Sequence, residues 1–146
     1  MSAKEGAHWT RGPGPDAVFA RHLAAGEFRI QRCAACARHV FYPRLACSHC
    51  GSVELQWQVP SGRGKVYAVS VVNRSADKGG PYNVVLVDLA EGPRMMGRVD
   101  GIAHDSVRIG MAVKARVGQG AGGEPCVVFE VRSEERRVGK ECLRLC

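Results

Sequence analysis

The stretch Cys33-Ala-Ala-Cys36, with Cys47-Ser-His-Cys50 after a gap of ten residues, decides how the first part of the chain folds. Two cysteines separated by two residues direct both thiolates at one metal ion, and a second such pair completes a tetrahedral shell of four sulfurs. The spacing therefore predicts a structural metal site on these four cysteines. Four thiolates close the coordination sphere, so we expect no open position for a catalytic water.

Zinc is the metal that this pattern favours, because nothing else in the sequence suggests electron transfer. Iron in a rubredoxin-like site would use the same four sulfurs and stays open as the alternative. His49, between two of these cysteines, is expected to face solvent. Cys126, in an apolar strand much later in the chain, is expected to be a small buried side chain. A ribbon with so little core of its own should need the ion to fold, since structural zinc contributes about 10 kcal/mol or more in small fingers.

The composition sets the wider limits. The chain has 146 residues, 45% hydrophobic and 24% charged, which is a globular composition with room for one domain or two small modules. No apolar run approaches the length that crosses a membrane, and no secretory signal follows Met1. We therefore expect a cytoplasmic protein whose seven cysteines serve metal or thiol chemistry rather than disulfides.

Changes in composition divide the chain into four parts. The stretch Arg132 to Cys142 reads RSEERRVGKEC, which looks like the in-frame translation of a sequencing adapter; a charged, solvated tail is the alternative. The expected parts are a flexible N-terminal arm at 1–15, a helix plus metal ribbon at 16–60, an OB-type barrel at 61–131, and the adapter artefact or disordered tail at 132–146.

The residues before and after the cysteines predict one helix and two strands. Asp16 is placed as the N-cap of a short helix that carries an apolar stripe and stops at Gly26. Residues 28–31 alternate apolar and polar side chains, as a half-buried strand does. Residues 53–59 alternate in the same way and form a further strand.

The remainder of the chain has an all-β pattern. Short apolar runs alternate with turns rich in glycine and proline, which favours a small barrel of OB type over a sandwich with more strands. The five predicted strands are Lys65–Asn73, Tyr82–Ala90, Arg94–Val99, Met111–Val117 and Cys126–Val131.

The first two barrel strands are apolar on both of their faces. One face would fill the barrel, and the other needs cover. The N-terminal helix and the metal ribbon are one candidate for that cover. A partner subunit is the other, because soluble monomers seldom expose wide apolar patches.

No catalytic constellation emerges from the other residues. The nucleophile elbow, the phosphate loop, the dinucleotide fingerprint and the zinc-protease motif are all missing from the sequence. His104 and Asp105 are neighbours and form no dyad by adjacency. We therefore expect this chain by itself to have no enzymatic activity.

Four segments of the chain form an ordered pattern: GEFRIQRCAACARHVFYPRLACSHCGS, SGRGKVYAVSVVNR, PYNVVLVDLAEGPRMMGRV and IGMAVKARV. Together they resemble the domain of unknown function 35 family, over about Asp16 to Val131. The resemblance implies a mainly β protein, with a short N-terminal helix and a rubredoxin-like zinc ribbon followed by a five-stranded OB-fold barrel. It also implies that the zinc ligands are Cys33, Cys36, Cys47 and Cys50.

The same resemblance implies a non-catalytic accessory subunit in lipid or steroid acyl-CoA metabolism. Members of the family associate with thiolase-like enzymes, including lipid-transfer-type aldolases, and some pair with or are fused to MaoC-like hydratases. The expected ligand is CoA or acyl-CoA, and the partner enzyme would supply the chemistry.

Coenzyme A carries phosphates, which call for arginine or lysine, and a pantetheine arm, which calls for an apolar slot. On the basis of the resemblance, Arg38, Arg44 and Arg63 are the predicted phosphate contacts. Ordinary solubilising surface charge is the alternative for these arginines.

Two other functions stay open at this point. A single-stranded nucleic-acid-binding OB-fold would need a basic groove and aromatic stacking platforms, and the predicted barrel strands hold only Tyr67, Tyr82 and Phe129. A scaffold that contacts a partner enzyme without binding any ligand is the other.

Overall fold

A computed structural model describes residues 13–132 of the chain. The chain divides after Pro60 into two compact units. The predicted arm falls outside the described residues except for 13–15, and so does the adapter-like tail except for Arg132. Within the described part, no helix is both long and apolar enough to span a membrane.

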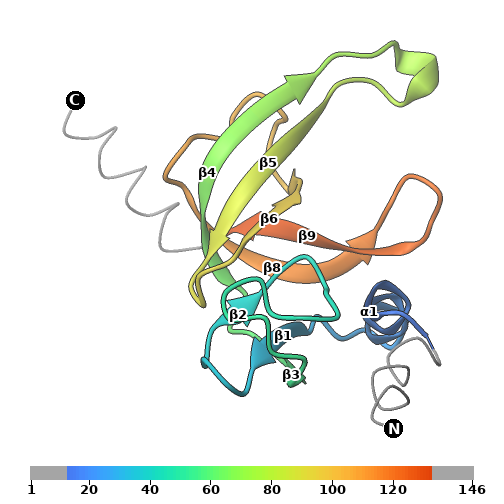
Figure 1. Ribbon diagram of the computed structural model, residues 1–146. Helices are drawn as coiled ribbons and strands as arrows, with labels where there is room; N and C mark the ends of the chain where they lie inside the picture. The colour runs from blue at the N-terminus through green and yellow to red at the C-terminus, as the bar shows by residue number, and fades with distance from the viewer. Residues whose placement is uncertain (1–12, 133–146) are drawn as a thin grey trace, which may run out of the picture. The chain divides into compact units, whose positions relative to one another are not determined.

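The first unit begins with helix α1 (Pro15–Ala24), drawn in blue in Figure 1. Its Phe19 and Leu23 side chains are buried. The N-cap is Gly14 and not Asp16, so that prediction was wrong. Proline is well suited to the first helical position because its fixed φ is already helical, and the helix therefore starts one residue before Asp16. Asp16 lies in the first turn, where its charge interacts favourably with the helix dipole.

Three short antiparallel strands form the ribbon sheet, in the order β2-β1-β3. They are β1 (Ile30–Cys33), β2 (His39–Val40) and β3 (Leu55–Gln58). The last strand is shorter than the predicted 53–59, and Val53 and Val59 at its two ends are exposed. The central strand β1 ends at Cys33, so the sheet itself positions the first cysteine of the candidate metal site.

Aromatic side chains join α1 to the ribbon. The Phe19 ring lies 5.7 Å from Phe41 and 6.4 Å from Trp57, measured between ring centroids, and His22 lies 5.2 Å from Trp57. Tyr42 extends the cluster, 5.5 Å from Phe41. Because large rings bury much area per residue, this cluster supplies the helix side of the first unit with a small apolar core.

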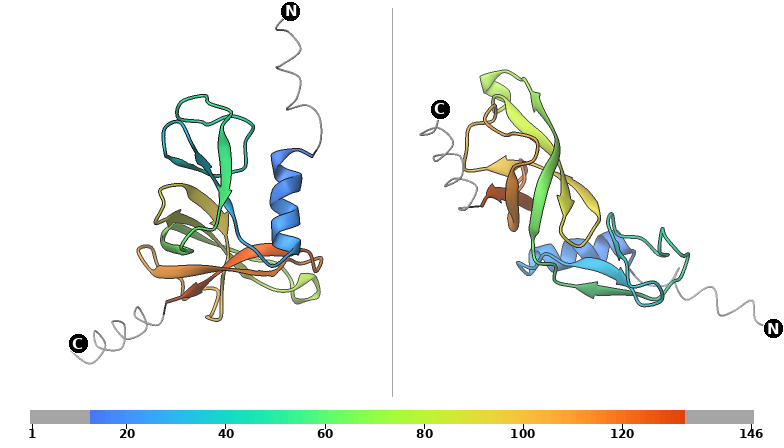
Figure 2. Two further views of the ribbon diagram at one scale, coloured as in Figure 1. Left: turned by 90° about the horizontal axis from the view of Figure 1, so that it is seen from below. Right: turned by 90° about the vertical axis from the view of Figure 1, so that its left-hand side faces the viewer.

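The second unit is a β-barrel. Its strands are β4 (Arg63–Val72), β5 (Tyr82–Leu89), β6 (Arg94–Gly97), β7 (Val99–Asp100), β8 (Ala112–Gln119) and β9 (Pro125–Val131), with a 3-10 turn, η3 (Ala76–Lys78), between β4 and β5. Their order in the sheet is β6-β5-β4-β8-β9-β7. The long curved strand β4 pairs with β5 along its length and with β8 at its start (Figures 1 and 2).

The sheet closes through β6 and β7, which are two pieces of one strand interrupted at Arg98. β6 pairs with β5, while β7 pairs in parallel with β9, and the Phe129 N–H donates to the Arg98 carbonyl at 2.9 Å. Counted this way, the barrel has the five strands of an OB-fold, although six separate strands are observed. The predicted mainly β class is confirmed, with a short helix and a ribbon before an OB-fold.

The barrel core is aliphatic. Val85, Val87 and Leu89 of β5 point inward and are buried, as is Phe129 of β9. Gly64 permits close packing here, because a Cβ at this position would lie 2.6 Å from a methyl carbon of Val87. The interior is therefore a continuous hydrophobic core.

One buried polar side chain interrupts that core. The Asn83 carboxamide donates to the Val99 carbonyl at 2.9 Å and accepts from the Val99 N–H at 2.8 Å. Both polar atoms of the amide are thus satisfied inside the barrel. This clamp holds the start of β7 against β5, at the point where the sheet closes.

Candidate metal centre

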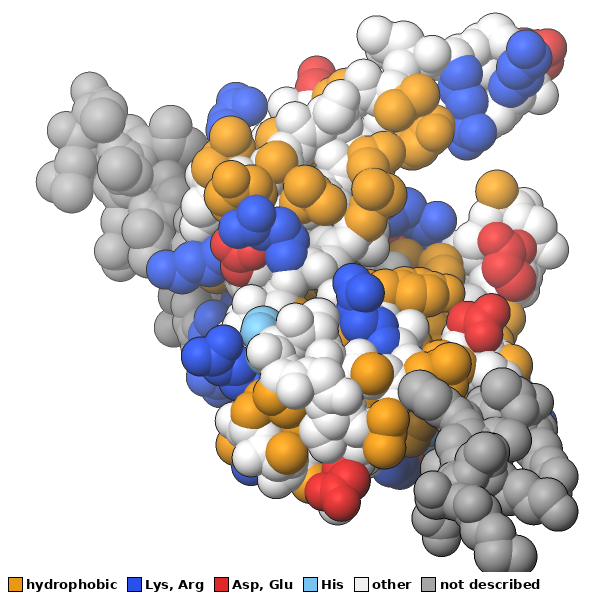
Figure 3. Space-filling model, in the orientation of Figure 1, with side chains coloured by type: hydrophobic (Ala, Val, Ile, Leu, Met, Phe, Trp, Pro, Cys, Tyr) orange, Lys and Arg blue, Asp and Glu red, His pale blue; other side chains and the backbone are white. Residues whose placement is uncertain are grey.

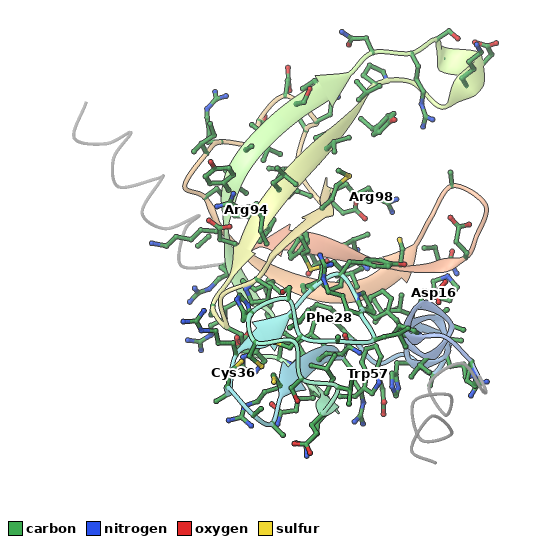
Figure 4. All side chains as sticks on the ribbon, in the orientation of Figure 1. Asp16, Phe28, Cys36, Trp57, Arg94 and Arg98 are labelled. Carbon is green, nitrogen blue, oxygen red and sulfur yellow. The ribbon has the colours of Figure 1, made fainter. Side chains whose placement is uncertain are left out.

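The four cysteine sulfurs of the ribbon gather in one place, beside the labelled Cys36 in Figure 4. The Sγ atoms of Cys33 and Cys50 are 3.5 Å apart, those of Cys36 and Cys47 are 3.7 Å apart, and all four lie within 4.8 Å of one another. A tetrahedral zinc ion with bonds of about 2.3 Å would hold its sulfurs about 3.8 Å apart. The four thiols therefore have the spacing of a single tetrathiolate metal site.

Two turns with matching hydrogen bonds present these sulfurs. In the first, the Ala37 N–H donates to the Cys33 carbonyl at 2.9 Å, and in the second the Gly51 N–H donates to the Cys47 carbonyl at 2.9 Å. Both donors have a left-handed backbone, with φ of 64° at Ala37 and 78° at Gly51. The sequence therefore builds the same knuckle twice, once with glycine and once with alanine at the left-handed position.

Backbone N–H groups favour the ionised form of two of the thiols. The pKa of Cys33 is lowered to about 6, chiefly by the backbone N–H of Cys36. Burial of the Cys47 thiol opposes ionisation, but the backbone N–H groups of Cys50 and His49 outweigh it and lower the pKa of Cys47. These N–H groups stabilise negative charge on sulfur, as a metal thiolate requires.

The Cys50 thiol behaves in the opposite way. The backbone N–H of Ser52 acts to lower its pKa, but the hydrogen bonds with the other cysteines, Cys33 first, raise the pKa of Cys50 to about 12. Four sulfurs this close cannot all carry negative charge without a cation among them. The donor set is therefore suited to a divalent metal, which would let all four ionise together.

Around the four sulfurs themselves the ribbon buries little apolar material, because its aromatic side chains gather on the side that faces α1. Its buried cluster consists of Cys33, Val40 and Cys47, with Cys36 and Leu55 packed against it. Three of these five side chains belong to the metal site itself. The metal-binding region therefore resembles small modules whose metal supplies much of the folding energy.

The arginines predicted to contact phosphate belong to three different segments of the chain. The Arg38 guanidinium, in the first knuckle, is 3.4 Å from Nδ1 of His49 in the second. Arg44 lies in the loop between the knuckles, and Arg63 is the first residue of β4 in the second unit. All three side chains are exposed, and within residues 13–132 no carboxylate pairs with any of these three guanidinium groups.

The role of Gln31 could not be predicted from the alternation of residues 28–31, the strand that is observed as β1 (Ile30–Cys33). This side chain is buried, with its amide donating to the Arg44 carbonyl at 2.9 Å and its Oε1 accepting from the Arg44 N–H at 2.7 Å. A glutamine inside an apolar and polar alternation looks like a solvent-facing residue. Only its partner, thirteen residues away, shows that it fixes the loop between the knuckles.

The predicted exposures of His49 and Cys126 have different outcomes. His49 is exposed, as expected for a residue inside a knuckle. Cys126 is only half-buried, because it lies one residue from the start of β9, near the loop that follows β8. The description of Cys126 as a buried small side chain was therefore wrong.

The ribbon with its four cysteines and the barrel that follows define a class of proteins in which a zinc ribbon is joined to an OB-fold. Residues 21–56 match the model of the ChsH2 rubredoxin-like zinc ribbon domain, and residues 57–118 match that of the ChsH2 C-terminal OB-fold domain. The two matches are contiguous and together span residues 21–118, which include parts of both units.

Three known proteins are similar to this chain. A probable enoyl-CoA hydratase alpha subunit of Thermomonospora curvata is 41% identical over 86 residues, which are 58% of this chain and 27% of that protein. A DUF35 domain-containing scaffold protein of Methanocaldococcus jannaschii is 35% identical over 88 residues, 58% of this chain and 62% of that protein. A chain of the Ltp2-ChsH2(DUF35) aldolase superposes with a TM-score of 0.71 at 31% identity, covering 83% of this chain and 97% of the other.

This chain belongs to the DUF35 family. It matches nearly the whole of the solved relative, but it spans only about a quarter of the hydratase subunit and under two thirds of the scaffold protein.

Proposed function

We propose that this chain is a non-catalytic accessory subunit of an enzyme that acts on acyl-CoA thioesters in lipid or steroid metabolism. The observation that carries the proposal is its similarity, over 97% of the other chain, to a component of the Ltp2-ChsH2(DUF35) aldolase. The scaffold name of the archaeal relative supports a non-catalytic role. The partner would be a thiolase-like aldolase or a MaoC-like hydratase.

The partner is tested by co-purification. The full chain is co-expressed with the Ltp2 aldolase subunit and, separately, with a MaoC-like hydratase subunit. Stable co-elution and a gain in the partner's activity on an acyl-CoA substrate are expected for the correct class. Activity of this chain alone on the acyl-CoA substrate of the aldolase or of the hydratase would contradict the accessory role.

Within that role, we assign Cys33, Cys36, Cys47 and Cys50 as ligands of a structural zinc ion. The sulfur spacing and the depressed pKa of Cys33 support this assignment. Bound zinc would supply folding energy and no chemistry, because four thiolates leave no position for a substrate. Elemental analysis of the purified protein should find one zinc per chain, whereas a coloured ferric thiolate spectrum would identify iron instead.

CoA phosphates are the proposed ligands of Arg38, Arg44 and Arg63. Support comes from the exposed guanidinium groups, which have no carboxylate partner among residues 13–132, and from the Gln31 clamp that fixes the Arg44 backbone. Reversal of all three charges to glutamate should weaken CoA binding by the assembled complex. Arg108→Glu, which alters an exposed arginine elsewhere in the second unit, is the matched control.

Binding of single-stranded nucleic acid is the competing function, and the aromatic residues disfavour it. The Arg94 guanidinium lies 3.4 Å from the centroid of the Tyr67 ring, and Arg74 lies 4.6 Å from that of Tyr82. Both rings are thus already covered on one face by the protein's own cations, which leaves poor platforms for bases. Salt-dependent retention on single-stranded DNA would revive this alternative.

A further inference from the structure

An irregular pairing gives the barrel an apolar outer face. Val66 pairs with Val87, but Ala68 pairs with Leu86, so β4 holds one extra residue between these two pairs. Paired residues point to the same side of a sheet, and Val66 and Val87 are buried inside. Ala68 and Leu86 therefore point outward.

The same register puts further apolar residues on this side. Met96 pairs with Leu86 and is 66% exposed, and the bulge residue Tyr67 is 50% exposed. Farther along the hairpin, Val72 pairs with Tyr82, and each is 36% exposed. Figure 3 shows hydrophobic side chains gathered over β4, β5 and β6. We call this set the outer face: Tyr67, Ala68, Val72, Tyr82, Val84, Leu86 and Met96.

Three cations border the outer face where β4 meets β8. Arg63 lies directly opposite Lys114, and the next pair along the ladder, Gly64 and Val113, is buried. Side chains alternate along a strand, so Arg63, Lys114 and Lys65 all point outward. Asp88 lies opposite Lys65 and Glu130 lies opposite Lys114, but their ion pairs are with Arg94 and Arg116. Within residues 13–132 none of the three cations forms an ion pair. We call Arg63, Lys65 and Lys114 the cationic margin.

Like charges directly opposite on neighbouring strands destabilise a sheet unless something neutralises them. An apolar area rimmed by charge is also the usual composition of a protein-binding surface. A second copy of this chain is a poor occupant, because it brings the same cationic margin and a formal net charge of +7. A partner with an apolar centre and carboxylates along one side is complementary on both counts.

We propose that the outer face, with its cationic margin, is the surface on which an enzyme partner docks through an apolar patch edged by aspartate or glutamate. The inference rests on the proposed accessory role and adds to it the surface used and the chemistry of the surface it meets. The docking surface shares no residue with the four cysteines, and of the arginines assigned to CoA it includes only Arg63.

The test uses the full chain and purified Ltp2, with affinity measured by biolayer interferometry. Met96→Lys and Val72→Lys should each weaken binding by about tenfold or more, because a charge would enter a desolvated contact. Ile109→Lys is the matched control, since Ile109 is 71% exposed in the same unit but lies outside the outer face. Unchanged melting temperatures would show that all three variants fold.

The margin is tested separately with Lys65→Glu and Lys114→Glu, which leave Arg63 untouched. Each should slow association several-fold at low salt and flatten the dependence of the association rate on salt. If wild type binds Ltp2 and Met96→Lys binds equally well, the docking surface is wrong while the accessory role stands. If wild type itself fails to bind, the proposed role for this class of partner fails, and the docking surface fails with it.

Two other results would also overturn the inference. Concentration-dependent dimerisation that Met96→Lys abolishes would make a second copy the occupant. Retention on single-stranded DNA that is lost in the same variant would make nucleic acid the occupant. Protection of Met96 from oxidation in the Ltp2 complex, but not in the free chain, is the direct signature expected of the proposed contact.

Discussion

The ribbon and the barrel solve the same problem of stability with different materials. The buried cluster around the ribbon cysteines holds only Val40 and Leu55 besides the cysteines themselves. The barrel instead buries aliphatic side chains around Phe129. The stability gained from hydrophobic burial grows with the number of apolar side chains that a module can bury. A small region with few such side chains therefore depends on metal coordination bonds. The two units should therefore respond to different perturbations.

Removal of the metal should produce the largest difference. Because structural zinc contributes about 10 kcal/mol or more in small modules, chelation or Cys36→Ser should unfold the ribbon strands. The barrel strands should keep their slow hydrogen exchange, since their core is independent of the site. Hydrogen exchange of the full chain, with and without chelator, measures both units in one experiment. Cys126→Ser is the matched control, because it removes a cysteine outside the cluster.

Equal loss of protection in β4 and β5 on chelation would contradict this comparison. It would mean that the barrel owes its stability to the ribbon, and that the division after Pro60 is not a division in folding.

The converse perturbation is Asn83→Leu in the barrel. It leaves the Val99 N–H and carbonyl buried without partners, which should cost about 3 kcal/mol of unfolding free energy. Metal affinity should not change, because the site lies in the other unit. Denaturant unfolding followed by barrel exchange gives the first quantity and chelator competition gives the second. Asn73→Leu, at an exposed position, should alter neither.

The two buried amides, Asn83 and Gln31, also show what the sequence leaves unread. The cysteine pairs reveal themselves because metal ligation requires a fixed local spacing. Gln31 and Asn83 act on backbone atoms that are thirteen and sixteen residues away, and no local pattern encodes such a partner. Both were therefore invisible until the strands were placed.

The bulge in β4 is a similar case. The run Val66-Tyr67-Ala68-Val69 is apolar throughout, so alternation cannot tell which residue is extra. The register with β5 settles it and turns Ala68 outward. The sequence predicted that one face of the first two barrel strands would need cover. Only the register in the structure shows which residues form that face.

Acidity should weaken the metal site in a defined direction. The pKa of Cys33, about 6, means that this thiol is already ionised above neutrality and gives up no proton there. The pKa of Cys50, about 12, means that it carries a proton that an incoming metal must displace. Metal affinity should therefore rise with pH between about 6.5 and 8.5, by about tenfold per unit for this one proton.

Below about pH 6 the slope should steepen, because Cys33 then also carries a proton that the metal must displace. Chelator competition across this pH range measures the slope, and calorimetry in buffers of different ionisation enthalpy counts the protons directly. The barrel provides the internal control, since its hydrogen exchange, corrected for intrinsic rates, should show no matching transition. An affinity independent of pH would indicate that all four thiols are ionised before the metal arrives.

The smallest effect distinguishes the two knuckles from each other. Ala37 and Gly51 occupy equivalent left-handed positions, and a side chain there costs about 1–2 kcal/mol that glycine avoids. Glycine also loses more entropy on folding, which offsets part of the difference. Ala37→Gly should therefore stabilise the metal-loaded protein by about 0.5–1 kcal/mol, and Gly51→Ala should destabilise it by a similar amount. Denaturant unfolding of the ribbon measures both, and shifts of the same sign would show that φ does not govern the knuckles.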